Sequence, residues 1–199
     1  MRSTAAFLLS LAVFFAAFPA HAQSGFFDPD KKQWVEYTLT PEAAGKIARK
    51  KYKRKMVSYY GKEAPGTIVI DTDDRWLYHV QGNGKAMRYG IGVGKDGFTW
   101  SGTEKITRKA KWPGWTPPPE MIVRERKNGR RLPAYMPGGP KNPLGARALY
   151  LGNTIYRIHG TNEDWSIGRA VSSGCIRMLN DDVEHLYDNV KIGTQVKVM

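Results

Sequence analysis

Cysteine is almost absent from this sequence, because Cys175 is the only one among 199 residues. A lone cysteine has no partner for an intrachain disulfide, so this thiol is not a structural cross-link. Structural zinc takes four protein ligands and catalytic zinc three. One cysteine and four scattered histidines do not supply a recognisable set. We therefore expect no metal centre, and no motif indicates a cofactor.

Acidic residues and long apolar runs are also scarce. The chain has 18 acidic and 31 basic residues and a formal charge of +13, which favours an anionic partner. The apolar stretch from Ala5 to Phe18 is shorter than the ~20 residues that a transmembrane helix needs. It follows Arg2 and precedes Ala20-His21-Ala22, the layout of a secretory signal peptide cleaved after Ala22. An uncleaved anchor is the alternative, and we expect no stable membrane span.

Export would affect how both the lone cysteine and the positive charge are interpreted. In an oxidising compartment paired cysteines become structural disulfides, and a single one left over suggests a reactive thiol. An exported protein seldom meets nucleic acid, so we expect an acidic wall polymer or a membrane surface as the anionic partner, and no nucleic acid. The predicted location is the periplasm, within the cell envelope.

Composition divides the chain into a signal peptide at 1–22, a basic N-terminal extension at 23–62 and a main domain at 63–199. In the extension, Thr40 and Pro41 form a helix start, with the threonine as cap and the proline in the first turn. A run of lysines and arginines then leads into strand-prone residues. This run either contacts an anionic polymer or is simply a charged, solvated surface.

The main domain begins with short apolar stretches separated by turn residues. Strands are predicted at 67–71, 75–80, 86–92, 147–151, 154–158 and 195–199. Asn83-Gly84 and Gly152-Asn153 are typical of hairpin turns. Asn180-Asp181-Asp182 offers a cap, with acids in the first turn, for a predicted helix that ends near Val190. These features predict a mostly β domain with antiparallel pairing and one helix near its end.

Two segments between the strands have unusual compositions. Gly90, Gly92, Gly94 and Gly97 are not followed by a helical pattern, so we interpret them as turn or bulge residues rather than a dinucleotide loop. Residues 100–145 are rich in Trp, Pro and Gly, and so long a loop is typical of a functional lid.

Trp112 and Trp115 lie in this predicted lid. One interpretation is that they line a substrate groove. The other is that their large apolar rings only pack the loop onto the core.

Cys175 is the candidate nucleophile. A free cysteine is often only a small buried apolar residue, but here Ser172, Ser173 and Gly174 precede it and leave the backbone open. A nearby imidazole would convert the thiol to the reactive thiolate. The other histidines lie in the signal, within a strand or beside acids on the last helix, so His159 is the best partner.

The pattern His159-Gly160-Thr161, followed by Ser172-Ser173-Gly174-Cys175-Ile176-Arg177, resembles the signature of the L,D-transpeptidases, the family built on the YkuD domain. The similarity extends over residues 65–199. It implies a YkuD-like β-sandwich in which the thiol attacks a peptidoglycan tetrapeptide stem and releases D-alanine. An amine then resolves the acyl-thioester, giving 3→3 cross-links or a wall-anchored protein. The resemblance also implies inhibition by carbapenems.

The resemblance assigns roles to individual residues. It implies that Cys175 is the nucleophile, that His159 is the general base, and that the Gly160 carbonyl orients the imidazole. The backbone around Ser173 and Gly174 would supply the oxyanion donors. Arg177, Ser172, Trp112 and Trp115 are the candidate substrate-binding residues. A structural ion pair is the other interpretation of Arg177.

Position 173 departs from the commonest form of the motif, which has a histidine before Gly-Cys. That histidine is not the base, so His159 keeps its role, and the departure leaves the choice of acceptor open. Two alternatives to transfer remain. Water could resolve the thioester, as in an L,D-carboxypeptidase or a releasing enzyme, or the chain could be a non-catalytic module that binds the wall.

Overall fold

The computed structural model describes residues 25–28, 33–36, 39–95 and 100–199. The chain forms two compact units, 1–38 and 39–199. In the first unit β1 (Gly25–Asp28) and β2 (Gln33–Glu36) form an antiparallel pair. The predicted signal peptide lies outside the described residues. Among the helices that are described, none is long and apolar enough to cross a bilayer.

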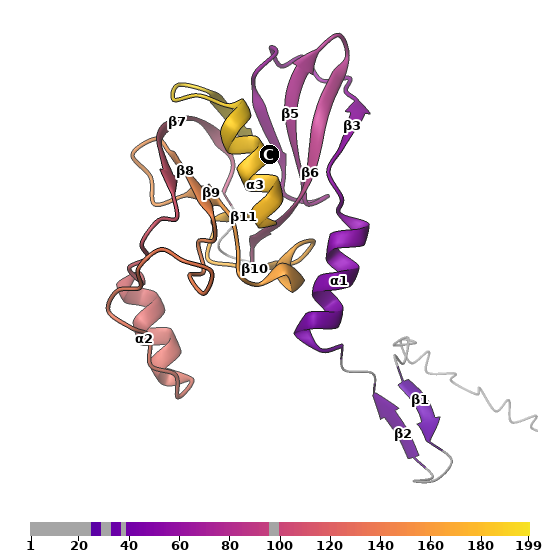
Figure 1. The fold of residues 1–199 in the computed structure, drawn as a ribbon, viewed down its shortest axis with the longest axis vertical. Helices are drawn as coiled ribbons and strands as arrows, with labels where there is room; N and C mark the ends of the chain where they lie inside the picture. The colour runs from indigo at the N-terminus through magenta and orange to yellow at the C-terminus, as the bar shows by residue number, and fades with distance from the viewer. Residues whose placement is uncertain (1–24, 29–32, 37–38, 96–99) are drawn as a thin grey trace, which may run out of the picture. The chain divides into compact units, whose positions relative to one another are not determined.

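The second unit is built on one ten-stranded sheet (Figure 1). Its strands are β3 (Lys55–Ser58), β4 (Ile68–Asp71), β5 (Trp76–Gly82), β6 (Lys85–Gly94), β7 (Gly102–Lys111), β8 (Arg147–Leu151), β9 (Arg157–His159), β10 (Ala170–Ser172), β11 (Ile176–Met178) and β12 (Gln195–Val198). The prediction of a mostly β domain is confirmed. Both predicted hairpins also form, and Asn83, Gly84 and Gly152 have the positive φ that such tight turns need.

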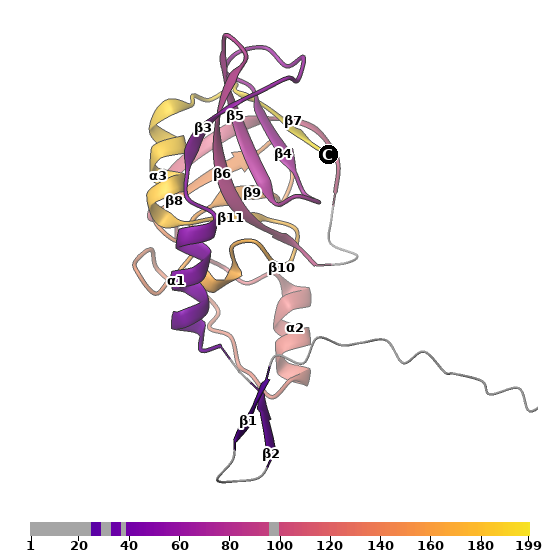
Figure 2. The ribbon, with the colours of Figure 1, turned by 90° about the vertical axis from the view of Figure 1, so that its right-hand side faces the viewer.

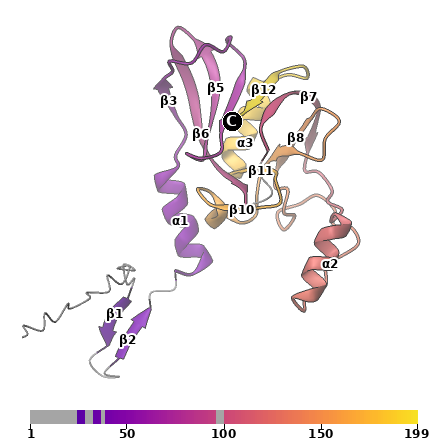
Figure 3. The same ribbon diagram turned by 180° about the vertical axis from the view of Figure 1, so that it is seen from behind.

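Strand β6 closes the sheet on itself. Its first half pairs with β5 and β3, and its second half pairs with β11 and β10. From β11 the sheet continues through β9, β8, β7, β12 and β4 back to β5. Seen from behind, β12 lies beside β7 (Figure 3). The sheet therefore encloses one core, whose fully buried members include Ile70, Tyr89, Leu149 and Ile158.

The glycines of β6 serve close packing rather than turns. Gly90 and Gly92 lie inside the strand, and Gly97 lies outside the described residues. A Cβ on Gly92 would lie 2.6 Å from the Ser166 carbonyl oxygen, and one on Gly90 would overlap Tyr52. For Gly90 and Gly92 the prediction of turns and bulges is wrong, because other chain segments cross directly over this strand. Within the described residues the strand continues to Gly94 without forming a strand-to-helix phosphate loop.

Helix α1 (Pro41–Lys51) begins where the sequence predicted. Thr40 Oγ1 accepts a hydrogen bond from the Ala43 amide at 3.2 Å. The helix packs on the short 3₁₀ helix η1 (Asp164–Ser166), where Arg49 forms an ion pair with Asp164 at 2.7 Å.

The basic run therefore has structural partners. Arg54 contacts the Asp182 carboxylate at 3.1 Å, and β3 pairs with β6. Residues 39–62 belong to the same compact unit as the rest of the domain.

The predicted loop at 100–145 contains two regular elements, β7 and α2 (Pro119–Lys127). Strand β7 was missed because Ile106 is its only buried apolar residue, although it pairs with strands on both sides. The guanidinium of Arg108 lies over the Tyr150 ring on the outer face. Helix α2 buries no residue and begins in a proline run, so it has no apolar pattern to reveal it.

Helix α3 (Asn180–Asn189) covers one side of the core with Val183 and Leu186. The predicted cap is wrong, because Leu179 occupies the N-cap position and Asn180 is already in the helix. The Asn180 side chain instead accepts a hydrogen bond from the Ala146 amide at 2.9 Å. It thereby ties the helix to the start of β8.

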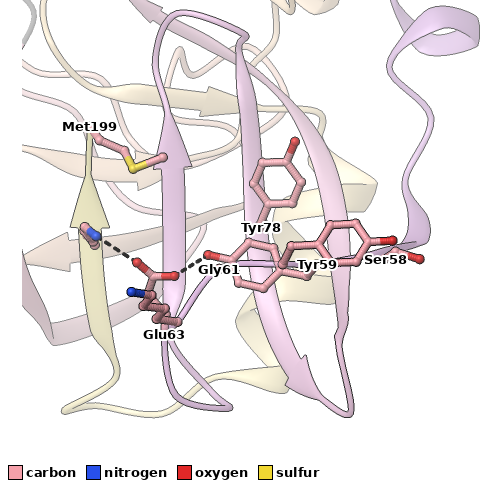
Figure 4. A pocket seen from close by; sticks show the side chains of 9 residues that line it. Ser58, Tyr59, Gly61, Glu63, Tyr78 and Met199 are labelled. Carbon is pink, nitrogen blue, oxygen red and sulfur yellow. Dashed lines mark hydrogen bonds and ion pairs between the residues drawn. The ribbon is translucent and has the colours of Figure 1, made fainter.

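Glu63 links the segment after β3 to the last strand (Figure 4). Its carboxylate accepts hydrogen bonds from Lys197 at 2.7 Å and from the Tyr59 hydroxyl at 2.6 Å, beside a surface pocket. A Cβ on Gly61 would collide with the Tyr59 hydroxyl and the Glu63 carboxylate, so glycine leaves room for their hydrogen bond. These hydrogen bonds, first that from Lys197, lower the pKa of Glu63 to about 2.

Replacing Glu63 by Gln should lower the free energy of unfolding at neutral pH by about 1 to 2 kcal/mol, as expected for hydrogen bonds to a charged group. A carboxyl whose pKa is depressed by folding stabilises above its unfolded pKa and loses that effect as the pH falls. The difference between the variants should therefore shrink as the pH falls from about 5 to about 2. Urea titrations at several pH values measure it.

Glu42→Gln is the matched control, because Glu42 forms an exposed pair with Lys46 in which both side chains are more than three-quarters accessible. Its effect should be close to zero. The structural role of Glu63 would be contradicted if both variants lost the same free energy of unfolding, or if the effect of Glu63→Gln did not change with pH.

Candidate active site

Parallel pairing of β9 with β11 brings the two halves of the sequence motif side by side. Ile176 lies opposite Ile158, and Arg177 lies opposite His159. Both isoleucines are buried in the core. Because side chains alternate along a strand, His159 and Arg177 point to the other face. Cys175 directly precedes β11, two positions before Arg177, the residue that lies opposite His159.

His159 is held in one tautomer. Its Nδ1 lies 2.5 Å from the Gly160 carbonyl oxygen, and the residue is 4% exposed. A carbonyl only accepts hydrogen bonds, so Nδ1 carries the proton and Nε2 keeps its lone pair. Burial lowers the pKa of His159 to about 3, and the positive charge of Arg177 acts in the same direction. The imidazole is therefore neutral and able to accept a proton.

Cys175 is partly buried, and its Sγ lies 3.8 Å from the Ile155 carbonyl oxygen. Burial raises the pKa of the thiol above its usual value, against the positive charges of Arg157 and Arg177, which lower it. Burial thus disfavours the charged form of both partners. The thiol and the imidazole are therefore both neutral in the resting protein.

A buried hydroxyl shapes the loop that carries the thiol. Ser172 is 3% exposed, and its Oγ donates to the Cys175 carbonyl at 2.6 Å and accepts from the Gly174 amide at 3.2 Å. Gly174 has φ +103°, which strongly favours glycine. The structure thus places Ser172 beneath the loop, where it sets the loop conformation, rather than on a surface that a substrate would touch.

The same contacts narrow the choice of oxyanion donors. The Gly174 amide is engaged by Ser172, which leaves the amides of Ser173 and Cys175 as the candidates. The Gly174 carbonyl accepts a hydrogen bond from Trp100 Nε1 at 3.3 Å. The Trp100 ring stacks on Tyr156 with 4.7 Å between centroids. This aromatic pair supports the loop from one side.

Arg177 is engaged in an ion pair. Its Nη1 lies 2.7 Å from Glu163 Oε2, and its side chain is 18% exposed. The Glu163 amide in turn donates to Thr161 Oγ1 at 3.0 Å. Arg177 was interpreted either as a substrate-binding residue or as part of a structural ion pair, and the structure contains the ion pair.

Trp112 and Trp115 are held by their own segment. The Trp112 amide donates to the Ala146 carbonyl at 2.8 Å, and Trp115 pairs with Met136 through two backbone hydrogen bonds. Trp112 has φ +44° and is 42% exposed. These contacts fix the segment next to β8, and among the described side-chain contacts none joins either indole to Cys175.

The segment between β7 and β8, which carries Trp112 and Trp115, contacts the nucleophile loop through Arg124. Arg124 on α2 approaches Ser173 Oγ with its Nη2 at 3.4 Å. Helix α2 lies below β10, the strand that leads into the nucleophile loop (Figure 2).

Three residues near the site escaped the sequence interpretation: Trp100, Arg124 and Glu163. The first two lie in or at the edge of a segment interpreted as one long loop, where no periodicity singled them out. Glu163 lies between the two motif halves, and only the parallel pairing of β9 and β11 brings it to Arg177. In the described ranges, no three His, Cys, Asp or Glu side chains gather in a way that could hold a metal ion.

A family model and several known proteins match the main domain of this chain. The family model described as YkuD, L,D-transpeptidase catalytic domain, matches residues 65–198. The chain is 40% identical over 137 residues to the probable L,D-transpeptidase ErfK/SrfK of Escherichia coli K12, covering 66% of this chain and 43% of that protein. For the probable L,D-transpeptidase YbiS of the same organism the values are 39% over 136 residues, with 66% and 44% covered. The chain spans less than half the length of these relatives.

Solved structures share the fold. A crystal structure from Brucella melitensis, described as a probable carnitine operon oxidoreductase CaiA, is 47% identical, with a TM-score of 0.50 and coverage of 75% of this chain and 94% of that one. L,D-transpeptidase 3 from Mycobacterium tuberculosis is 13% identical, with a TM-score of 0.51 and coverage of 83% and 90%. The latter likeness is one of fold alone.

The neutral state of the thiol predicts how Cys175 reacts with iodoacetamide. Because the thiolate is the nucleophile and burial raises the pKa of this thiol, alkylation should be slow near pH 7 and become faster up to and beyond about pH 9. Intact-protein mass measures the rate on the only cysteine of the chain. N-acetylcysteine is the reference and should reach half its maximal rate at a lower pH. A rate already at its plateau near pH 7 would indicate a preformed thiolate.

Proposed function

Because this chain belongs to the YkuD family of L,D-transpeptidase catalytic domains, we propose that it is a cysteine-dependent peptidoglycan L,D-transpeptidase. The observation that carries the proposal is the pairing of two strands: one ends at a buried, neutral imidazole whose tautomer is fixed by the Gly160 carbonyl, and the other directly follows the only thiol. That arrangement is suited to nucleophilic acyl transfer with general-base assistance.

The first half-reaction forms an acyl-enzyme. His159 Nε2 takes the proton of Cys175 as Sγ attacks the carbonyl carbon of the third residue of a tetrapeptide stem. The bond to the terminal D-alanine then breaks, and the imidazolium returns the proton to the departing amine. Because both partners start neutral, the proton moves as the carbon–sulfur bond forms rather than beforehand.

The oxyanion of each tetrahedral intermediate lies at the loop before the nucleophile. The amides of Ser173 and Cys175 are its proposed donors, and one such donor is typically worth about 3 kcal/mol of transition-state stabilisation. Ser172 and Trp100 act as positioning residues, because they hold the loop from beneath and from the side.

The second half-reaction transfers the acyl group. An amine attacks the thioester carbonyl while His159 accepts its proton; the carbon–sulfur bond then breaks, and the imidazolium returns the proton to Sγ to regenerate the thiol. The acceptor is the diamino acid of a second stem, giving a 3→3 cross-link, or a lysine of a protein that becomes anchored to the wall. The exposed Trp112 and the half-buried Trp115 are proposed to border the acceptor side.

The proposed setting is the periplasm. The apolar stretch at 5–18 acts as a signal peptide, and the charge of +13 favours residence on an anionic wall polymer. Neither a metal nor a cofactor takes part in the proposed chemistry, since the thiol and the imidazole supply the nucleophile and the base.

The product of the reaction with purified tetrapeptide muropeptides tests the proposal. Mass spectrometry should detect dimers that have lost one D-alanine, and Cys175→Ala should abolish D-alanine release. Tripeptides without dimers would indicate hydrolysis by an L,D-carboxypeptidase or a releasing enzyme. Release that survives Cys175→Ala would exclude the thiol mechanism, and binding without any release would favour a wall-binding module.

Carbapenems provide a second test of the nucleophile. A catalytic domain of Enterococcus faecium L,D-transpeptidase has been solved in a form acylated by ertapenem. We expect ertapenem to form one adduct with this protein, located on the peptide that contains Cys175. Intact mass and peptide mapping measure it, with Cys175→Ala as control. An adduct elsewhere, or none, would count against an activated thiol.

A further inference from the structure

The donor of the proposed reaction carries a charge that needs a partner. Release of D-alanine requires the substrate to end one residue beyond the attacked carbonyl, so its terminal carboxylate lies within the length of one residue of the Cys175 thiol. Arg177 is the cation that the motif offers, but its guanidinium is 18% exposed and paired with Glu163 at 2.7 Å. The charge of Arg177 therefore already has an acidic partner.

Arg157 lies next to the nucleophile across two paired strands. Ile158 of β9 lies opposite Ile176 of β11. Arg157 directly precedes the first isoleucine, and Cys175 directly precedes the second. The thiol also reaches the turn before β9, because Sγ lies 3.8 Å from the Ile155 carbonyl oxygen. Burial raises the pKa of Cys175, and the charge of Arg157 is the strongest influence in the opposite direction, so the guanidinium lies within electrostatic reach of the thiol.

The guanidinium of Arg157 is supported by an aromatic ring rather than by an acid. Tyr150 pairs with Arg157 across β8 and β9, and the guanidinium carbon lies 5.3 Å from the centre of the Tyr150 ring. No carboxylate among the described residues forms an ion pair with Arg157, and its buried Nε has no hydrogen-bond partner among them. The residue is partly exposed. Stacking occupies a face of the guanidinium, so its charge and its N–H edge are left for an anion.

We propose that Arg157 binds the terminal carboxylate of the donor stem, with Tyr150 as the surface that holds the guanidinium in place. The planar fork of an arginine binds a carboxylate through two parallel hydrogen bonds. The Tyr150 ring holds the cation by a cation–π contact and adds no negative charge that would compete with the ligand. The inference rests on the proposed function and deepens it, because it names the group that recognises the free end of the donor.

Two synthetic peptides test the subsite: a tetrapeptide stem ending in D-alanine, and the same peptide ending in D-alaninamide. Calorimetry in a Cys175→Ala background measures their binding without turnover. The free acid should bind about tenfold or more tightly than the amide, as expected for hydrogen bonds between charged groups. Adding Arg157→Gln should abolish this preference by weakening the acid alone. Arg157→Lys should restore part of it, because lysine keeps the charge without the fork.

The supporting ring has its own test. Tyr150→Leu should lower the preference for the acid about twofold to fivefold, the effect of losing one cation–π contact. Tyr150→Phe keeps the ring and should keep the preference. An equal weakening of acid and amide in Tyr150→Leu would contradict the role of the ring, because a general loss of structure affects both peptides alike.

Arg108→Gln is the matched control. Arg108 lies over the same Tyr150 ring, with its guanidinium carbon 3.4 Å from the ring centre, but it is an exposed residue of β7. Its replacement should leave the ratio of the two dissociation constants unchanged. A preference that survives Arg157→Gln overturns the proposal, and so does a loss that appears instead in Arg108→Gln or Arg177→Gln. Equal binding of the two peptides while Arg157 is intact overturns it without any further variant.

Release of D-alanine by the wild-type protein separates this proposal from that of the reaction. If no D-alanine is released while the Arg157-dependent preference is present, the reaction is refuted and the subsite stands. If D-alanine is released and the preference is absent or does not depend on Arg157, the reaction stands and the subsite is refuted.

Discussion

The parallel pairing of β9 with β11 determines where His159 and Arg177 lie in the candidate site. Ile158 and Ile176 anchor the two strands in the core, and their neighbours His159 and Arg177 are thereby directed to the opposite face. Neither strand is longer than three residues. They are held in register because β8 pairs with β9, and β6 pairs with β11. The closed sheet therefore converts two distant stretches of sequence into one rigid surface.

The electrostatics of this surface follow from burial. Enclosing the imidazole and the thiol disfavours the charged form of each, and the arginines beside them act on both. A permanent thiolate would be readily oxidised, since susceptibility follows thiolate character and exposure. A neutral thiol that is deprotonated only during attack suits a protein proposed to work in an oxidising compartment without a second cysteine.

Two segments outside the sequence motif, residues 39–62 and the segment between β7 and β8, make different contributions to the domain. Residues 39–62 cover the sheet through α1 and β3, and ion pairs of Arg49 and Arg54 fix them to η1 and α3. The segment between β7 and β8 instead carries α2, which buries no residue and contacts the nucleophile loop through Arg124. The first addition stabilises the fold, whereas the second brings a charged side chain to the site.

The sequence alone determined the β character of the domain, the hairpin at Asn83 and the cap at Thr40, because each depends on local pattern. It also offered Cys175 and His159 as the candidate nucleophile and base. It could not reveal β7, whose stability comes from partners on both sides rather than from an apolar face. It also left open whether Arg177 is free or paired, and it offered no sign of Arg124. Those answers depend on which segments the closed sheet places side by side, since contacts between distant residues leave no periodicity in the chain.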